Sequence, residues 1–293
     1  MNLKLFTIII PAFNEEEAIG KTLQELLQVE IEKECRILVI DDGSTDKTFE
    51  IAKSFPMVDV IRHPYNKGYG ASLKTGIKAS TTEFIILYDA DGQHTPENLV
   101  NIKKNLEEYD MLVGMRGKDS HQDWMRKPGK WILSKVANFL TGRKIPDLNS
   151  GLRVIKREVI LGMLHLFPDG FSFSTTSTIA FMNMGYNVGY YPIKVKKRVG
   201  KSTVKQLKHG SSTILLILRL ITLFNPLKIF IPSSIFLFII GFLYEIVFGL
   251  ILLPHIKLIP GALLLILSGV LVFFFGLVVD QLSELRKHIE RNK

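Results

Sequence analysis

Two long apolar runs near the C-terminus constrain this chain more than any other feature. Residues 229–253 read IFIPSSIFLFIIGFLYEIVFGLILL, with Glu245 as their one charge, and residues 258–279 read LIPGALLLILSGVLVFFFGLVV, with no charge. About 20 helical residues cross the roughly 30 Å hydrocarbon core of a bilayer. A soluble helix that is apolar on every face over such a length is rare. Because only residues 254–257 join the two runs, the sequence predicts a hairpin of two transmembrane helices.

Basic residues gather just before this hairpin. The chain holds 37 Lys+Arg against 28 Asp+Glu, a net charge of +9, and residues 170–244 contain no Asp or Glu. More Lys and Arg follow the second run, in residues 280–293. Because cytoplasmic flanks of membrane spans are rich in Lys and Arg, we expect a two-span cell-membrane protein with both termini in the cytoplasm. A basic stretch that adjoins two spans favours the lipid bilayer as its partner, and no nucleic acid partner is expected.

The segment before the first run has a different character. Residues 205–224 read KQLKHGSSTILLILRLITLF, an apolar stretch interrupted by Arg219 and followed by Asn225-Pro226. It is too short and too interrupted to span a bilayer, so we expect amphipathic helices in the membrane interface. Packing against the soluble domain is the alternative. The expected domains are a cytoplasmic domain (1–204), interfacial helices (205–228), a transmembrane region (229–279, with helices at 229–253 and 258–279) and a basic cytoplasmic tail (280–293).

The first two hundred residues alternate apolar, β-branched runs with segments of helical periodicity. The pattern predicts helices over residues 15–29, 71–79 and 96–108, and one more helix that Ser44 or Thr45 caps and that ends at Phe55. The predicted strands cover residues 5–10, 36–40, 58–62, 83–88 and 111–115. This order indicates an α/β fold, a mostly parallel sheet with helices on both faces.

Polar and acidic turns follow three of the predicted strands. They are Pro11–Glu16, Asp41–Asp46 and Asp89–His94. In parallel α/β sheets, ligands bind beyond the carboxyl ends of the strands, where these turns lie. Asp89 and Asp91 stand in what we expect to be an exposed turn, and paired carboxylates suit Mg²⁺ or Mn²⁺ bound together with substrate phosphates. A dinucleotide site would need G-x-G-x-x-G after the first strand, and its absence excludes a dehydrogenase of that type.

Six motifs in chain order carry a family resemblance. PAFNEE at 11–16, DDGSTD at 41–46, NKGYGASLKTGI at 66–77 and DADGQH at 89–94 resemble family 2 glycosyltransferases, which have the Rossmann-like GT-A fold. DLNSGLRVIKREVI at 147–160 and KRVGKSTVK at 197–205 narrow the resemblance to the polyprenyl-phosphate glycosyltransferases. Dolichol-phosphate mannose synthase and the bacterial undecaprenyl-phosphate glycosyltransferases belong to that group. The motifs run across about the first 205 residues, and the C-terminal hairpin fits members that carry transmembrane helices.

On the donor side, the resemblance implies a nucleotide sugar that is UDP- or GDP-linked. UDP-glucose, UDP-N-acetylglucosamine and GDP-mannose all stay open. Mg²⁺ or Mn²⁺ would be bound by Asp89, Asp91 and Gln93, and Asp91 would be catalytic through that ion. The residues implied to bind the nucleotide sugar are Pro11, Ala12, Phe13, Glu15, Asp42, Asp89 and Ala90.

On the acceptor side, the resemblance implies a polyprenyl or dolichyl phosphate. Its phosphate would be bound by Arg116, Lys130, Ser134, Arg198, Ser202 and Lys205. Lys130 departs from the family pattern, in which relatives often carry Arg, and Lys offers phosphate a point charge where Arg offers a planar fork. Asp147 matches an Asp that is often proposed as a catalytic base, or else it braces the loop before Arg153. Many members also have a carboxylate in the helix after FSF, where this chain has Thr175-Thr176-Ser177.

The chemistry of such an acceptor agrees with these roles. A phosphate monoester has a second pKa of about 6, so it is largely a dianion at neutral pH and hardly needs a general base. The barrier then lies in bringing two anions together and in stabilising the leaving nucleoside diphosphate. A divalent ion serves the leaving group, and basic side chains offset the repulsion on the acceptor side.

The resemblance therefore implies an inverting hexosyltransferase, of EC 2.4.1 type, on the cytoplasmic leaflet. A homo-oligomer formed through the transmembrane helices is left open. One alternative is a processive membrane polysaccharide synthase, a class that typically has a Q-x-x-R-W motif and more spans, neither of which this sequence contains. The other is a non-catalytic lipid-carrier scaffold, which the intact acidic turns disfavour.

Overall fold

The computed structural model describes residues 5–29, 34–104, 106, 108–117, 127–170, 172–196, 210–252 and 259–291. The chain divides into two compact units, Met1–Thr213 and Ile214–Lys293. The first unit holds a β-sheet, and the second holds the two long apolar helices. The finer division expected from the sequence, with boundaries after residues 204, 228 and 279, stays a prediction.

A seven-stranded sheet forms the centre of the first unit, in the order β3-β2-β1-β4-β6-β5-β7. Neighbouring strands are parallel except around β6, which runs antiparallel to β4 and to β5. The mostly parallel sheet predicted from the sequence is confirmed. Its strands are β1 (Phe6–Ala12), β2 (Cys35–Asp41), β3 (Val58–Arg62), β4 (Phe84–Leu87), β5 (Met111–Arg116), β6 (Arg153–Lys156) and β7 (Val188–Ile193).

The sequence predicts β1 to β5 and misses β6 and β7. β6 has only four residues, too few to show an alternating pattern. β7 contains Gly189 and Pro192, which are depleted in strands. Pro192 is tolerated because β7 lies at the edge of the sheet. The missed strand β6 matters for the site, because it inserts between β4 and β5.

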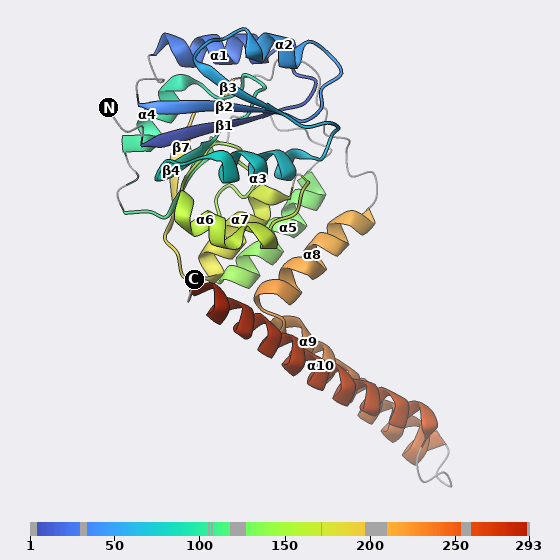
Figure 1. The fold of residues 1–293 in the computed structure, drawn as a ribbon. Helices are drawn as coiled ribbons and strands as arrows, with labels where there is room; N and C mark the ends of the chain where they lie inside the picture. Colours follow the sequence, from blue (N-terminus) through green and yellow to red (C-terminus); the bar gives the residue numbers. More distant parts are fainter. Residues whose placement is uncertain are drawn as a thin grey trace. The chain divides into compact units, whose positions relative to one another are not determined.

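Helices cover both faces of the sheet, as predicted (Figure 1). α1 and α2 lie on one side, and α3, α6 and α7 lie on the other. The helices of this unit are α1 (Ile19–Gln28), α2 (Thr48–Lys53), α3 (Tyr69–Ala79), α4 (Pro96–Lys104), α5 (Lys127–Thr141), α6 (Arg157–Met163), the 3₁₀-helix η3 (Leu164–Leu166) and α7 (Phe173–Asn183).

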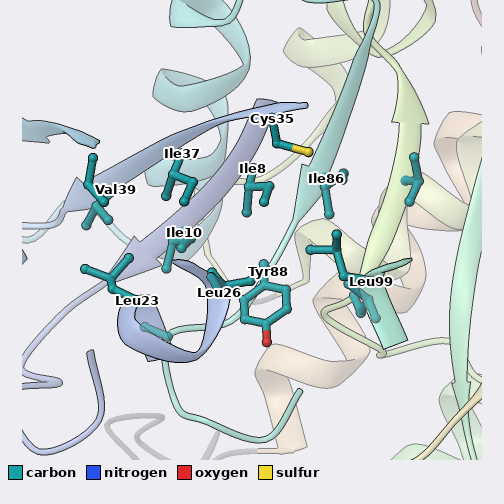
Figure 2. Packing of buried hydrophobic residues seen from close by; sticks show 14 of the residues in the cluster. Ile8, Ile10, Leu23, Leu26, Cys35, Ile37, Val39, Ile86, Tyr88 and Leu99 are labelled. Carbon is teal, nitrogen blue, oxygen red and sulfur yellow. The ribbon is translucent and has the colours of Figure 1, made fainter. Parts of the chain in front are cut away.

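Successive residues of β1 pack on opposite faces of the sheet, because side chains alternate along a strand. Ile8 and Ile10 join Leu23 of α1 in the main core cluster (Figure 2). Ile9 meets α3 at Gly76, where an added Cβ would lie 2.4 Å from Ile9 Cγ2. Burial on both faces fixes the register of β1 and hence the position of the turn that follows it.

The predicted starts of two helices are wrong. The helix predicted from residue 15 begins four residues later, because the Glu15 N–H donates to Thr48 Oγ1 (2.8 Å) and ties that stretch into a loop. α2 begins at Thr48, whose N–H donates to Asp46 Oδ1 (3.0 Å). Neither Ser44 nor Thr45 therefore caps α2, because Asp46 supplies the acceptor near its first turn.

The second unit contains the two apolar helices that the sequence predicts. α9 (Leu227–Tyr244) continues into a π-helix, η4 (Glu245–Leu252), and α10 (Pro260–Arg291) packs along α9. By length and composition, Leu227–Phe248 and Pro260–Arg286 could each cross a membrane, and only a small share of either is buried. The predicted tip, residues 254–257, lies outside the described residues.

α8 (Gly210–Phe224) precedes this hairpin. It corresponds to most of the segment for which we expect interfacial helices. Residues 205–209 of that segment lie outside the described residues, and its place at the membrane interface stays a prediction.

Glycines allow α9 and α10 to approach closely. A Cβ added to Gly276 would lie 2.5 Å from Cβ of Phe230, and one added to Gly241 would lie 2.8 Å from Cγ1 of Ile266. Close approach through small residues is characteristic of helix pairs in membranes, where lipid tails are as apolar as the side chains. Close packing at these glycines therefore helps to hold the two helices of the hairpin together.

Glu245, the single charge within the first apolar run, has a structural partner. Its Oε2 accepts a hydrogen bond from the N–H of Ile259, just before α10 (3.2 Å). The first N–H groups of a helix have no partner within the helix, and a carboxylate there is favourable. Glu245 thus helps to satisfy the start of α10.

Candidate active site

The turns after β1 and β2 are tied to each other at the carboxyl end of the sheet. The Asn14 N–H donates to Ser44 Oγ (3.0 Å), and Asn14 Oδ1 accepts from the Thr45 N–H (2.9 Å). Asn14 has a φ of 53°, a left-handed conformation that Asn adopts more readily than most residues. The two turns form a fixed rim at the edge where α/β sheets bind ligands.

The nucleotide-sugar residues predicted near this rim differ in exposure. Pro11 and Ala12 end β1 and are buried, and Ala90 is buried as well. Phe13 and Glu15 are partly exposed. Of these five residues, Phe13 and Glu15 therefore offer the side-chain surface that a ligand could contact.

Asp42, also predicted to bind the nucleotide sugar, has its carboxylate engaged within the protein. Its Oδ1 accepts from the Lys67 N–H (2.9 Å), and its Oδ2 accepts from the Gly68 N–H (2.8 Å). His63 Nδ1 lies 2.7 Å from the same Oδ1. Asp42 is only 3% exposed. In this arrangement it braces the loop between β3 and α3.

Asp89 lies two residues after the end of β4, and its side chain is 27% exposed. The Tyr69 hydroxyl donates to Asp89 Oδ1 (3.0 Å), and His94 Nε2 lies 3.8 Å from Oδ2. Burial raises the pKa of Asp89, but His94, Tyr69 and the positive charge of Arg116 outweigh burial and bring that pKa below its usual value. Asp89 is therefore a carboxylate at neutral pH.

Asp91 is buried, with 7% of its surface exposed, so the expectation of an exposed turn is wrong. Its Oδ1 accepts a hydrogen bond from the N–H of Gln93 (3.1 Å). The turn folds back in this way because Gly92 adopts a φ of 69°, which glycine tolerates without strain. Gln93 itself is partly exposed.

Asp89, Asp91 and Gln93 fit the oxygen chemistry of Mg²⁺ or Mn²⁺. Within the described ranges, no three His, Cys, Asp or Glu side chains are grouped so that they could hold a metal ion alone. Mg²⁺ does not need such a group, because one or two carboxylates and the phosphates of a substrate suffice. An ionised, partly exposed Asp89 beside Asp91 supplies hard oxygen ligands of this kind.

Arg116, the last residue of β5, forms a two-pronged ion pair with Asp147. Arg116 Nε donates to Asp147 Oδ2 (2.7 Å), and Arg116 Nη2 donates to Oδ1 (2.8 Å). The Arg116 N–H also donates to Oδ2 (3.2 Å). Hydrogen bonding to Asp147 raises the pKa of Arg116. Burial raises the pKa of Asp147, but the contacts with Arg116 outweigh burial and lower that pKa.

This pair joins Arg116, which the resemblance assigns to the acceptor phosphate, with Asp147, which it offers as a catalytic base. A carboxylate whose pKa is lowered by a bound guanidinium is a weak proton acceptor. The N–H of Asn149 also donates to Asp147 Oδ1 (3.2 Å), as expected of a residue that braces its own loop. Of the two roles that the sequence leaves open for Asp147, the geometry favours the brace.

Arg153, the first residue of β6, is a functional candidate that sequence reasoning missed. It is 0% exposed and is the largest fully buried side chain in the described part of the chain. Its Nε and Nη2 donate to the carbonyls of Ser150 (2.9 Å) and Leu148 (3.0 Å), and its Nη1 donates to Thr178 Oγ1 (2.7 Å). Arg153 therefore ties the loop that carries Asp147 to α7.

The composition of α7 is unusual. It is the sequence signal from which the role of Arg153 could have been predicted. Residues 174–178 are five consecutive hydroxyl residues, and all five are buried. A buried helix is ordinarily apolar, so such a run indicates polar partners inside the protein. Thr175 Oγ1 donates to Asn149 Oδ1 (2.8 Å), which links α7 to the loop of Asp147 a second time.

The predicted acceptor residues are described only in part. Ser134 lies in α5 and is partly exposed. Lys130 lies in the same helix, but its side chain lies outside what the structure describes. Arg198, Ser202 and Lys205 also fall outside the described residues. Their contact with a lipid phosphate stays a prediction.

Two protein families match parts of the chain. Residues 7–162 match Glycosyl transferase family 2, and residues 225–285 match the GtrB C-terminal hairpin. The first match covers more than half of the 293 residues. It includes the acidic turns and both partners of the Arg116–Asp147 pair, and the second match includes most of α9 and α10.

Three relatives cover between 54% and 65% of the chain. An uncharacterized protein of Methanocaldococcus jannaschii is 36% identical over an alignment of 197 positions that covers 64% of this chain and 79% of that protein. The undecaprenyl-phosphate 4-deoxy-4-formamido-L-arabinose transferase of Proteus mirabilis is 29% identical over an alignment of 165 positions that covers 54% of this chain and 51% of the transferase. The UDP-N-acetylglucosamine–dolichyl-phosphate N-acetylglucosaminyltransferase of Methanococcus voltae is 27% identical over an alignment of 217 positions that covers 65% of this chain and 85% of that enzyme. The chain thus spans about half the length of the Proteus transferase.

A solved structure has the same fold as the first unit. Glucosyl-3-phosphoglycerate synthase of Mycobacterium tuberculosis, crystallised with Mn²⁺, UDP and glucosyl-3-phosphoglycerate, superposes with a TM-score of 0.59 at 15% identity. The superposition covers 75% of this chain and 79% of the synthase. At this identity the likeness concerns the fold alone, and it confirms the predicted GT-A class.

Proposed function

Because the chain belongs to glycosyl transferase family 2, we propose that it transfers a sugar from a nucleotide sugar to a polyprenyl or dolichyl phosphate at a membrane. The observation that carries the proposal is the Asp89 carboxylate, ionised and partly exposed just beyond β4. A carboxylate so placed suits a metal-bound diphosphate, which a nucleotide sugar supplies. The two apolar helices of the same chain suit a lipid acceptor.

Named relatives support the classes of donor and acceptor. The Methanococcus voltae enzyme is named for UDP-N-acetylglucosamine and dolichyl phosphate, and the Proteus mirabilis enzyme is named for undecaprenyl phosphate. The Mycobacterium tuberculosis synthase was crystallised with Mn²⁺ and UDP. We infer a UDP- or GDP-linked donor and Mg²⁺ or Mn²⁺ for this chain. The identity of the sugar stays open.

On the donor side, the rim after β1 would receive the nucleoside. Phe13 and Glu15 have the exposed surface to contact the base and ribose, while Pro11 and Ala12 are buried. Asp42 would act by holding the loop between β3 and α3 in place.

The diphosphate would lie at the turn after β4. Asp89, Asp91 and Gln93 would hold the divalent ion, and Ala90, which stands between the two aspartates in the sequence, is buried. Bound there, the ion would act as a Lewis acid on the leaving nucleoside diphosphate. The Tyr69 hydroxyl fixes one oxygen of Asp89 for this task.

On the acceptor side, a phosphate oxygen would form a bond to the anomeric carbon as the bond from that carbon to the nucleoside diphosphate breaks. This single displacement inverts the configuration of the carbon. A phosphate dianion carries no proton that must be removed, so Asp147 is left to hold Arg116. The positive charges and donors proposed to bind the acceptor phosphate are Arg116, Lys130, Ser134, Arg198, Ser202 and Lys205.

We further propose that the catalytic unit and both termini face the cytoplasm, with the hairpin tip on the far side. The Lys and Arg residues on both flanks of the hairpin support this orientation. Single cysteines placed at His255 and Asn292, in a chain whose Cys35 is replaced, would be labelled in intact cells with a membrane-impermeant reagent. Labelling at position 292 without labelling at 255 would refute the orientation.

The proposed activity can be tested by screening nucleotide sugars. Purified full-length protein in detergent would be incubated with a radiolabelled polyprenyl phosphate, each UDP- or GDP-sugar in turn, and Mg²⁺ or Mn²⁺. We expect one donor to yield a lipid-linked monosaccharide, and we expect EDTA to stop the reaction. A folded preparation that forms no lipid-linked sugar from any of these donors, or that forms a polymer instead, would overturn the proposal.

A further inference from the structure

Both oxygens of the Asp89 carboxylate meet a specific neighbour. Oδ1 accepts a hydrogen bond from the hydroxyl of Tyr69 (3.0 Å). Oδ2 lies over Gly151, where an added Cβ would stand only 1.8 Å away. Any larger residue at position 151 would therefore force the carboxylate to rotate.

Tyr69 is well placed to hold Oδ1 in one direction. It is the first residue of α3, and Ser174 at the start of α7 also hydrogen-bonds with its hydroxyl. Two helices therefore determine where this donor lies.

Gly151 is held in place by the loop around it. Arg153 donates to the carbonyls of Ser150 (2.9 Å) and Leu148 (3.0 Å), two residues that precede Gly151 in the sequence. Asp147, four residues before Gly151, is fixed by its pair with Arg116. The backbone at Gly151 therefore cannot retreat easily to make room for a side chain.

We propose that Tyr69 and Gly151 are positioning residues that hold the Asp89 carboxylate in the orientation in which it binds the divalent ion. This inference rests on the function proposed above. Groups that orient a metal ligand matter nearly as much as the ligand, and their loss typically lowers metal affinity or activity by about 10- to 100-fold. Tyr69 acts by donating to one oxygen, and Gly151 acts by leaving space for the other.

The test measures Mn²⁺ binding directly, with no turnover. Full-length protein in detergent would be titrated with Mn²⁺ in the presence of UDP or GDP, and free Mn²⁺ would be followed by its electron paramagnetic resonance signal. Tyr69→Phe removes only the donating oxygen, and Gly151→Ala adds only the obstructing methyl group. We expect each to weaken Mn²⁺ binding by about 10- to 100-fold, and we expect thermal melting to stay close to that of the wild type.

Two matched variants control for the chemical change itself. Tyr190→Phe removes the hydroxyl of another tyrosine, whose buried oxygen has no hydrogen-bond partner among the described residues. Gly162→Ala adds a methyl group in α6, where no atom of the described residues lies within 4 Å of the new atom, apart from the chain neighbours and backbone of the same helix. Both controls should bind Mn²⁺ as the wild type does.

The outcomes separate this inference from the proposed function. Wild-type protein that binds Mn²⁺ while Tyr69→Phe and Gly151→Ala bind it equally well would overturn the positioning role and leave the function standing. Wild-type protein that binds no Mn²⁺ with either nucleotide would overturn the metal-dependent function and the inference with it. Weaker Mn²⁺ binding by Tyr69→Phe or Gly151→Ala at an unchanged melting temperature, with both control variants binding as the wild type does, would support the positioning role.

Discussion

Arg116 and Asp147 are joined by three hydrogen bonds, from Arg116 N, Nε and Nη2 to the two carboxylate oxygens of Asp147, at 3.2, 2.7 and 2.8 Å. A paired guanidinium keeps its orientation, and a paired carboxylate is a poor base. The pair therefore suggests that Asp147 works by aiming Arg116 at the acceptor phosphate.

Asp147→Asn distinguishes a brace from a base. Asparagine keeps the shape of the side chain and one acceptor oxygen but loses the charge that holds Arg116. For a brace we expect the KM for polyprenyl phosphate to rise about tenfold, which corresponds to losing about 1.4 kcal/mol of binding. Steady-state kinetics with varied lipid phosphate would measure this. A fall in kcat of a hundredfold or more at unchanged KM would instead identify Asp147 as a general base.

Asp147 should also make folding stability depend on pH. Its pKa is lower in the folded protein than in the unfolded chain, so its contribution is fully present above the unfolded value of about 3.9 and is lost as pH falls from there through the folded pKa. The stability of the wild type should therefore exceed that of Asp147→Asn by a constant amount above about pH 5 and by less at lower pH. Denaturant unfolding in detergent from pH 3 to pH 7 would test this. A difference that grows as the pH falls would contradict the assignment.

Asp91→Asn should abolish turnover and metal-dependent nucleotide binding while the fold is kept. Asp91 is 7% exposed and accepts from the Gln93 N–H, and asparagine retains that acceptor without the charge that a divalent ion needs. Nucleotide binding with and without Mn²⁺, together with thermal melting, would check it. Near-normal activity with either Mg²⁺ or Mn²⁺ would remove Asp91 from the metal site.

Arg198 lies in the basic stretch that precedes the hairpin, and its substitution tests whether that stretch contacts the acceptor phosphate. If Arg198 contacts the acceptor phosphate, Arg198→Ala should raise the KM for polyprenyl phosphate or lower kcat, with little change in nucleotide-sugar affinity. The expected loss is about 1.5–3 kcal/mol, because a charge-assisted hydrogen bond disappears. General attraction to anionic lipid would contribute about 1 kcal/mol and would survive in Arg198→Lys. Kinetics of Arg198→Lys that equal those of the wild type would therefore reject a specific contact.

Gly276→Ala should destabilise the helical hairpin. The added Cβ would lie 2.5 Å from Cβ of Phe230, so α9 and α10 must move apart. Overpacking of this kind typically costs about 1–3 kcal/mol. Unfolding of the detergent-solubilised protein would measure it, with Leu271→Ala at an exposed position of α10 as the control. Equal stability of the two variants would mean that the glycine is not needed for packing.

Much of the fold could be predicted because it is encoded in short stretches of chain. Residues 5–10 are apolar on both faces and form β1, and the uncharged run at 258–279 forms most of α10. The Asp89–Asp91 turn could be placed at a strand end for the same reason, since strand and turn are neighbours in sequence. Periodicity and hydropathy act over a few residues, so the sequence alone is enough to predict them.

The contacts that complete the candidate site were decided only by the tertiary structure. Arg116 lies 31 residues before its partner Asp147, and Gly151 meets Asp89 because β6, a four-residue strand with no visible pattern, inserts beside β4. The burial of Asp91 likewise depends on the direction of the turn at Gly92. The first two of these contacts join groups from separate elements once the chain has packed. No local sequence pattern predicts them, because they depend on hydrogen bonds and close packing between residues that are distant in the sequence.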